Sequence, residues 1–265
     1  MLLWNMLKAF FAPEGKYPPA GLPSVASVSY LAITVFIVGK SLKRHRWYTT
    51  NEFYPVVRKQ LTVLWIMEII KIVFRWCTGH FSDLNSWLPL YFCSITLFAG
   101  VMAGWGKGFV RRIGLVFMMT GGMVGGALFL TYPSSSILLF PAFHYQCVHS
   151  FVYHGCMVYL SALAYRTEAI TLHASDFKWY ALYTGFFCAL ALGLNLSLGT
   201  NLMFISKPFK GTFLDWVYQL LGEGFYTTVL ILMHIFGPFW SMLLIRNKSH
   251  LLDPPMQQIC SEPLA

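Results

Sequence analysis

The chain has 265 residues, of which 57% are hydrophobic, 17% aromatic and 11% charged. Soluble domains carry roughly 25% charged residues, so this composition and the mean hydropathy of +0.58 exclude an ordinary soluble fold and predict a polytopic membrane protein. The formal net charge of +9 is attributed to membrane topology and contact with anionic lipid, and no nucleic-acid partner is expected from it.

The first segment in chain order, residues 1–21, is apolar but short and is interrupted by Pro13, Pro18 and Pro19. We expect it to lie at the membrane interface as an attached segment, and not to be a cleaved signal peptide. Seven apolar runs follow, most of them near the ~20 residues that a helix needs to cross hydrocarbon; they are residues 22–39, 61–77, 87–105, 113–132, 147–165, 179–198 and 225–245. The fold prediction is therefore an all-α bundle of seven transmembrane helices, forming one integral membrane domain over residues 1–265.

The basic residues are distributed unevenly among the expected connections. Of the 19 lysines and arginines, 13 lie in or beside the first, third and fifth connections and the carboxyl-terminal tail: Lys40, Lys43, Arg44, Arg46, Arg58, Lys59, Lys107, Arg111, Arg112, Arg166, Lys178, Arg246 and Lys248. Because cytoplasmic loops carry the excess of Lys and Arg, we expect the amino terminus outside and residues 246–265 as a cytoplasmic tail. Membrane phospholipids are the expected partners, and the sequence carries no signal for an oligomeric state.

Three of the runs carry reactive polar residues at similar calculated depths. At about 1.5 Å per residue, Cys93, His154 and Asn195 lie roughly 9, 10 and 5 Å below the outer ends of their runs, and His149 lies roughly 3 Å below. Polar side chains in hydrocarbon are costly without a partner, so this layer is a candidate site. The thiol of Cys93 becomes a good nucleophile as a thiolate, and a neighbouring imidazole can remove the thiol proton. An amide such as that of Asn195 can orient the imidazole or donate to an oxyanion. The alternative is that Cys93 is a small core residue.

Other polar residues within the runs have both a structural and a functional interpretation. Glu68 and Lys71 are three residues apart and can form an ion pair that fixes packing, or Glu68 can relay protons. Arg75, near the outer end of the same run, can contact a lipid head group. His234 is expected to be a packing histidine and ranks below His154 as a candidate base.

The sequence around Cys147, His149, His154 and Cys156 has the residue types of a metal site. On a helix, however, Cys147 and His154 share one face and His149 and Cys156 another, with the members of each pair roughly 10 Å apart along the axis. Neither pair can bind one ion directly, so we expect no local metal site and no cofactor.

The connection after the sixth run, residues 199–208, carries Asn201 and Lys207 on the outer side. Lys207 is expected at the membrane surface, where a lysine can meet a phosphate. Asn201 is either a substrate contact or the cap of a helix end or turn.

Three segments carry a resemblance to a known family: Leu88-Pro-Leu-Tyr-Phe-Cys93-Ser, His149 through His154-Gly, and Leu194-Asn195 through Gly199-Thr-Asn201-Leu-Met-Phe204 followed by Pro208. In order and spacing, over about residues 25–245, they resemble the motifs of the YwaF-like bacterial integral membrane proteins, which are similar to the animal transmembrane protein 164. The resemblance implies a multi-pass protein of a cell membrane, here the cytoplasmic membrane of a bacterium. One departure is Tyr91, because the bacterial pattern usually has His two residues before the cysteine.

The animal relatives are regarded as lipid acyltransferases that move a polyunsaturated acyl chain onto ether lysophospholipids through a cysteine thioester with the help of histidine. The resemblance therefore implies Cys93 as the acyl acceptor and His154, or failing it His149, as the base. The candidate contacts to the lipid substrate are Asn201, Lys207, Arg75 and Tyr91. The alternative function is a small-solute transporter or ligand-binding membrane protein without catalysis, in which the intramembrane histidines, Glu68 and Lys71 line a polar path.

Overall fold

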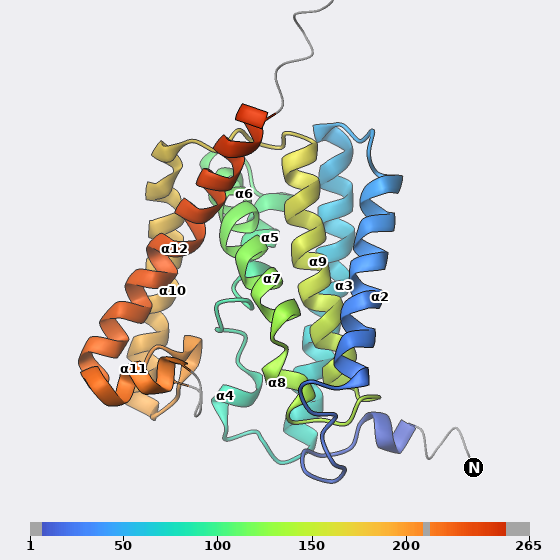
Figure 1. The fold of residues 1–265 in the computed structure, drawn as a ribbon, viewed down its shortest axis with the longest axis vertical. Helices are drawn as coiled ribbons and strands as arrows, with labels where there is room; N and C mark the ends of the chain where they lie inside the picture. The colour runs from blue at the N-terminus through green and yellow to red at the C-terminus, as the bar shows by residue number, and fades with distance from the viewer. Residues whose placement is uncertain (1–6, 209–212, 253–265) are drawn as a thin grey trace, which may run out of the picture.

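The computed structural model describes the backbone of residues 7–208 and 213–252, and the side chains of residues 7–208 and 215–246. All regular secondary structure in these residues is helical (Figure 1). After a helical stretch at 7–10, the elements are α2 (Val25–Arg44), α3 (Thr50–Cys77), α4 (Leu84–Trp87), α5 (Thr96–Trp105), α6 (Gly108–Phe117), the π-helix η1 (Met118–Gly122), α7 (Met123–Thr131), α8 (Ser134–Ile137), α9 (Tyr145–Arg166), η2 (Ala174–Asp176), α10 (Phe177–Leu198), η3 (Leu202–Phe204), α11 (Phe213–Leu221) and α12 (Glu223–Leu252).

The helices form a bundle in which segments distant in sequence pack side by side (Figure 1). α9 packs against α2, α3 and α7, and α10 packs against α6 and α12, so that α5, α6 and α7 lie between the two groups. One end of the bundle, here called the amino-terminal end, carries α4, α8 and α11 and lies at the bottom of Figure 1. The opposite end, here called the basic end, carries the connections after α2, α5 and α9, with Lys43, Arg44 and Lys107 among their flanking residues.

Five helices are long and apolar enough to cross a membrane: Val25–Arg44, Gly108–Thr131, Tyr145–Arg166, Ala174–Leu198 and Glu223–Arg246. They cover the first, fourth, fifth, sixth and seventh predicted runs, which confirms the all-helical, polytopic membrane fold for the described part of the chain. The second run lies in α3, which has 28 residues but carries Glu68, Lys71 and Arg75 among its charged side chains. Five of the seven predicted spans are thus found as helices that are long and apolar enough to cross a membrane.

The third predicted run, residues 87–105, is not one helix, and this part of the prediction is wrong. Its main helix, α5, begins only at Thr96 and has 10 residues, and residues 88–95 between α4 and α5 are not helical. Leu88 is extended, with φ −71° and ψ 122°, as expected for a residue before proline, and Pro89 has no N–H with which to continue a helix. Residues 88–95 are called the Cys93 segment below.

α5 and α6 form a close pair beside this segment. Gly114 of α6 lies directly against the backbone of α5, because a Cβ at this position would be 2.4 Å from Ala99 O and 2.5 Å from Ala103 N. Small residues allow membrane helices to approach this closely. The neighbouring atoms belong to the backbone, so rotation of a side chain cannot make room for a methyl group.

Gly114→Ala is expected to lower the melting temperature of the detergent-solubilised protein, because α5 and α6 must separate to accept the methyl group, and overpacking of this kind costs about 1–3 kcal/mol. Gly193→Ala is the matched control, since nothing lies within 4 Å of the Cβ position at Gly193 in α10. The control is expected to be neutral or stabilising, because alanine favours a helix over glycine. Circular dichroism melting measures both variants, and equal melting temperatures would contradict the close contact.

Candidate functional site

The backbone of the Cys93 segment is held by tyrosine hydroxyls from two other helices. The hydroxyl of Tyr153 on α9 donates to Cys93 O at 3.1 Å and to Ser94 O at 3.3 Å, and the hydroxyl of Tyr183 on α10 donates to Ile95 O at 2.6 Å. Carbonyl groups at membrane depth need partners within the protein, because hydrocarbon offers none. These carbonyls also accept the backbone N–H groups of Thr96, Leu97 and Ala99, so the two tyrosines add a second donor to each and tie the segment to α9 and α10.

The Cys93 sulfur packs on a glycine of α7. Its Sγ atom is 3.7 Å from Gly125 O, and a Cβ added to Gly125 would lie 3.3 Å from this sulfur and 3.5 Å from Met157 Cε. Gly125 is six residues before the end of α7 and Met157 is twelve residues after the start of α9, so the sulfur lies about 9 Å along α7 and about 18 Å along α9 from the ends of these helices.

His154 presents its ring to the same helix. Its Nδ1 atom is 2.7 Å from Ser150 O. Because a carbonyl can only accept, Nδ1 carries the proton of the neutral ring and Nε2 keeps the lone pair. The ring stacks on Phe129 with centroids 3.7 Å apart and planes at 9°. Phe129 is one turn beyond Gly125 on α7, so the Cys93 sulfur and the His154 ring lie along one face of α7, about 6 Å apart in axial rise.

His149 belongs to a separate cluster with α3. Its Nε2 atom is 3.1 Å from Glu68 Oε2, and Glu68 Oε1 is 2.5 Å from Lys71 Nζ. The predicted Glu68–Lys71 pair is confirmed. The contact of His149 with this pair was not predicted from the sequence. The Glu68 carboxylate and the Lys71 ammonium are the paired charges of the cluster, and His149 Nε2 faces the second carboxylate oxygen. His149 lies eight residues before Met157, about 12 Å toward the amino-terminal end, so His154 is nearer in depth to the Cys93 sulfur.

Tyr153 links these groups and was not singled out from the sequence. Its ring is stacked with that of His149, with centroids 5.7 Å apart and planes at 22°, and it meets the His154 ring edge-on at 5.3 Å. Its hydroxyl reaches the backbone of Cys93. The available signal was its position four residues after His149, which places both side chains on one helical face.

His234 lies closer to the Cys93 segment than its low rank in the sequence analysis implies. Its ring meets Phe92 edge-on, with centroids 4.8 Å apart, and its Nδ1 atom is 2.6 Å from Leu230 O. It lies eleven residues into α12, about 17 Å from the amino-terminal end. His234 therefore lies at a depth similar to that of Cys93, on the α12 side of the segment.

The expectation that Asn195 orients an imidazole is not met. Its amide NH₂ donates to Leu202 O at 3.1 Å and to Ser206 Oγ at 3.0 Å. Its carbonyl accepts from Thr200 Oγ1 at 2.8 Å and from Leu202 N at 2.7 Å. An amide has two donors and two lone pairs, so no group of Asn195 remains for a histidine. The residue organises the loop that follows α10, because all four bonds are made within that loop.

Asn201 and Lys207 lie in the same loop. The Asn201 side chain donates to Lys207 O at 2.7 Å and accepts from Lys207 N at 2.9 Å, and Asn201 N donates to Asn85 Oδ1 at 2.7 Å. Of the two interpretations of Asn201, the structure supports the turn cap. The Lys207 side chain is exposed and remains a candidate phosphate contact. Tyr91, the fourth candidate lipid contact, uses its hydroxyl to donate to Asn85 O at 2.9 Å.

Arg75 does not face solvent, contrary to the expected head-group contact. Its Nη1 atom is 2.8 Å from Glu14 Oε2, and its guanidinium lies 5.0 Å from the centroid of the Phe140 ring. The residue is 8% exposed, because the amino-terminal segment covers it. His144 anchors the same segment, with Nε2 2.9 Å from Ala12 O. Residues 7–23 thus close the amino-terminal end of the bundle.

The residue types of a metal site on α9 do not converge. Cys147 Sγ is 3.5 Å from Pro141 O, and Cys156 Sγ is 3.6 Å from Gln60 Oε1. Within the described ranges, no group of three or more His, Cys, Asp or Glu side chains is placed to hold a metal ion.

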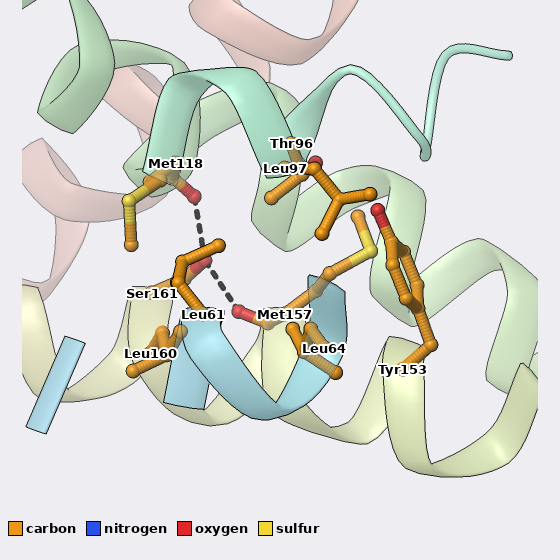
Figure 2. Close-up of a pocket in the computed structure, with 9 residues that line it drawn as sticks. All are labelled: Leu61, Leu64, Thr96, Leu97, Met118, Tyr153, Met157, Leu160 and Ser161. Carbon is orange, nitrogen blue, oxygen red and sulfur yellow. Dashed lines mark hydrogen bonds between the residues drawn. The ribbon is translucent and has the colours of Figure 1, made fainter. Parts of the chain in front are cut away.

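A small cavity lies where α3, α5, η1 and α9 meet, and Figure 2 shows the side chains around it. Its volume is about 10 Å³, near the lower limit for one water molecule and far below that of an acyl chain. Ser161, at its edge, donates to Met118 O at 2.5 Å and Met157 O at 2.7 Å. The lining residues are Leu61, Leu64, Thr96, Leu97, Met118, Tyr153, Met157, Leu160 and Ser161.

Glu68→Gln is expected to destabilise the protein by about 2 kcal/mol or more, because it leaves Lys71 beside a neutral amide in a buried site. Lys71 keeps 16% of its side chain exposed, which places the loss below the ~3–5 kcal/mol of a fully buried pair. The double variant Glu68→Gln/Lys71→Met removes both charges and is expected to recover at least half of the loss. Denaturant unfolding in detergent measures all three proteins, and a double variant less stable than Glu68→Gln would contradict the charge cluster.

Acidification is expected to release the amino-terminal segment through His144. Its Nε2 donates to Ala12 O, and its Nδ1 accepts from Gln146 N at 3.1 Å, an arrangement that needs the neutral ring. Burial lowers the pKa of His144 from its usual value near 6.5, more than the bond to Ala12 O raises it, and the charge of Arg75 lowers it further. The stabilisation is therefore complete above pH ~6.5 and is lost as the pH falls through the lowered pKa of the folded state.

The control for this pH dependence is His144→Asn, which keeps an acceptor at the start of α9 but does not titrate. The melting temperature of the wild type is expected to fall more between pH ~7.5 and pH ~5 than that of the variant. Parallel curves for the two proteins over this range would exclude His144 as the titrating group.

The comparisons with known proteins agree with this fold. The model of the TMEM164 family matches residues 17–244, a stretch that runs from the amino-terminal segment into α12 and contains the Cys93 segment, the α9 histidines and the 199–208 connection. No curated protein and no solved structure matches the chain. Because the matched stretch covers most of the sequence and contains the apolar helices described above, this multi-pass integral membrane protein belongs to the TMEM164 family.

Proposed function

We propose that the protein is a membrane lipid acyltransferase in which Cys93 carries the acyl group as a thioester and His154 acts as the base. The observation that carries the proposal is the position of the Cys93 sulfur, on a non-helical segment inside the bundle and on the same face of α7 as the His154 ring. Irregular backbone at membrane depth marks many functional sites. The resemblance of the sequence to the acyltransferase transmembrane protein 164 supports the same chemistry.

In the first half-reaction, Nε2 of His154 takes the thiol proton, and the Cys93 thiolate attacks the ester carbonyl of a phospholipid. The carbon–oxygen bond of the ester breaks, the leaving alkoxide takes the proton from the imidazolium, and a lysolipid departs. In the second half, the hydroxyl of an acceptor lysolipid gives its proton to His154 and attacks the thioester. The carbon–sulfur bond breaks, and the thiolate regains the proton. No electrons are gained or lost overall.

Two features of the geometry constrain this reaction. The imidazole lies about one helical turn from the sulfur, so contact requires a shift of the Cys93 segment or a bridging water, as is common in the absence of substrate. The sulfur also lies inside the bundle, about 9 Å from the end of α7 and about 18 Å from the start of α9, whereas ester carbonyls lie just below the head groups. The lipid must therefore be drawn into the bundle. The Cys93 residue is intermediate in exposure, but its sulfur packs on Gly125, so the segment must move to admit an ester.

We further propose seven membrane passes, with the amino terminus outside and the carboxyl terminus in the cytoplasm of a bacterial cell. α3 is about 42 Å long, enough for a pass, and its charged side chains Glu68 and Lys71 face α9 instead of lipid. The Cys93 segment together with α5 forms the third pass. The distribution of Lys and Arg supports this orientation.

The competing function is a small-solute carrier or ligand-binding membrane protein without catalysis. The buried row of Glu68, Lys71 and His149 supports it, since intramembrane charges often line transport paths. The two functions differ in their need for Cys93, because a carrier retains its activity when the sulfur is replaced by a hydroxyl.

The test is intact-mass analysis of the purified protein after incubation with phospholipid vesicles. Wild type is expected to gain an acyl mass that hydroxylamine removes, and Cys93→Ser is expected to gain none. His154→Ala is expected to acylate at least ~100-fold more slowly, the scale of general-base contributions. His234→Ala tests the other histidine at this depth and is expected to stay within a few-fold of wild type.

Cys77→Ser is the matched control, because Cys77 is an exposed cysteine at the end of α3, away from the proposed site. Its labelling is expected to equal that of wild type. Equal acyl labelling of Cys93→Ser and wild type would remove Cys93 from the mechanism and favour the carrier.

A further inference from the structure

The loop after α10, residues 199–207, makes one contact with α4 and one with the Cys93 segment. Asn201 N donates to Asn85 Oδ1 at 2.7 Å, which ties the loop to α4. The ring of Phe204 lies against the ring of Tyr91, with centroids 4.9 Å apart and planes at 33°. Tyr91 is two residues before Cys93, and its hydroxyl returns to Asn85 O. The loop therefore holds the shallow part of the segment.

The backbone of this loop is strained where it makes the aromatic contact. Met203 has φ 56° and ψ 6°, and Phe204 has φ 55°, so two successive residues with side chains adopt the left-handed region. Residues other than glycine rarely adopt this conformation, and they keep it only where the surrounding structure enforces it. Strained residues of this kind are concentrated at functional sites, so the strain favours a functional role for this loop.

Asn195 holds the loop in this strained conformation through its side-chain hydrogen bonds. Its four hydrogen bonds, to Thr200, Leu202 and Ser206, span the strained residues and lie in a buried environment. A fifth bond comes from α12, where the Tyr226 hydroxyl donates to Phe204 O at 3.0 Å. The loop is thus fixed on both sides of Met203, and the Phe204 ring is held against Tyr91.

The shallow end of the Cys93 segment needs such support because the turn bonds of the segment lie mainly at its deep end, from Ile95 N to Tyr91 O, from Thr96 N to Cys93 O and from Leu97 N to Ser94 O. Its deep end is fixed by the hydroxyls of Tyr153 and Tyr183, which bind the carbonyls of residues 93–95. Its shallow end has no comparable pair of backbone anchors among the hydrogen bonds described, and the loop meets it through Tyr91 and Asn85.

We infer that Asn195 and Phe204 are positioning residues for Cys93. Asn195 holds the 199–207 loop in its strained conformation. The loop in turn presses the Phe204 ring against Tyr91, and this contact sets the depth and rotation of the Cys93 segment. The inference rests on the proposed function for its catalytic consequence, but its structural content concerns only the Cys93 thiol. In this inference the residues from Asn195 to Phe204 act by positioning Cys93, and they neither contact the substrate nor bind an oxyanion.

The first experiment measures alkylation of individual cysteines by N-ethylmaleimide in the full-length, detergent-solubilised protein, by peptide mapping with mass spectrometry. Asn195→Ala and Phe204→Ala are expected to raise the alkylation rate of Cys93 about tenfold or more, because the segment opens locally. Cys188, which is buried on α10, reports global opening and is expected to keep its wild-type rate.

Two conservative variants complete the design. Phe204→Tyr keeps an aromatic ring on Tyr91 and is expected to restore the wild-type rate at Cys93. Ser197→Ala is the matched control on α10, since the Ser197 hydroxyl bonds only to Gly193 O within its own helix, and it is expected to change nothing. A positioning role requires this pattern of loss and rescue, which general destabilisation would not produce.

The second experiment measures thioester formation against phospholipid concentration in the same variants. Both Asn195→Ala and Phe204→Ala are expected to lower the maximal rate about tenfold. KM is expected to stay within about twofold in Phe204→Ala, which displaces the thiol but leaves the bonds between Asn201 and Lys207 in place, and to rise in Asn195→Ala, which also loosens the loop that carries Lys207. If wild type forms no thioester, the proposed function fails, and the alkylation data still decide whether the loop positions Cys93.

Two results would overturn the inference. Equal acceleration of Cys93 and Cys188 alkylation would mean that the loop only stabilises the fold. An unchanged Cys93 rate in both Asn195→Ala and Phe204→Ala would mean that the loop does not hold the segment.

Discussion

The structure depends on one constraint: inside a bilayer every backbone carbonyl must find its partner within the protein. The Cys93 segment interrupts a membrane-spanning run, and its carbonyls at Cys93, Ser94 and Ile95 each accept a backbone N–H of the following turn and a second bond from the hydroxyl of Tyr153 or Tyr183. The π-helix η1 beside it follows the same rule, since Ser161 binds Met118 O and Tyr165 binds Met119 O. Two irregular segments can therefore lie next to each other in the middle of the bundle, where a regular helix would present no such turn.

This constraint gives the central helix α9 two chemically different sides. His149 and His154 are five residues apart, which places them about 140° apart around the helix. His149 joins the charged cluster with Glu68 on α3, whereas His154 stacks on Phe129 of α7, the helix whose glycine receives the Cys93 sulfur. A buried charge cluster and an uncharged thiol–imidazole layer are thus separated by one helix, with the Tyr153 ring in contact with both histidines.

The motif that follows α10 is an example of conspicuous polar residues acting through the backbone. Asn195 and Asn201 lie in a segment that resembles a family motif, and the sequence predicted a catalytic amide at Asn195 and a substrate contact or turn cap at Asn201. In the structure both amides bind the loop itself, and the loop meets the Cys93 segment through Phe204. Arg75 likewise makes its contact within the protein, because its guanidinium pairs with the carboxylate of Glu14 beneath the amino-terminal segment. Depth calculations locate polar residues but do not say which way they face.

Composition and periodicity alone determined that the chain is an all-helical membrane protein, located five of its spans, and paired Glu68 with Lys71, because hydrophobicity over ~20 residues and i,i+3 spacing are local properties. Pro89 also marked the helix break locally, although the long apolar run around it outweighed that signal. Only the tertiary structure decided that His149 pairs with Glu68, that His154 and the Cys93 sulfur share a face of α7, and that Asn195 serves a loop. Contacts between helices distant in sequence depend on their rotation and depth in the bundle, and neither quantity is encoded in any one segment.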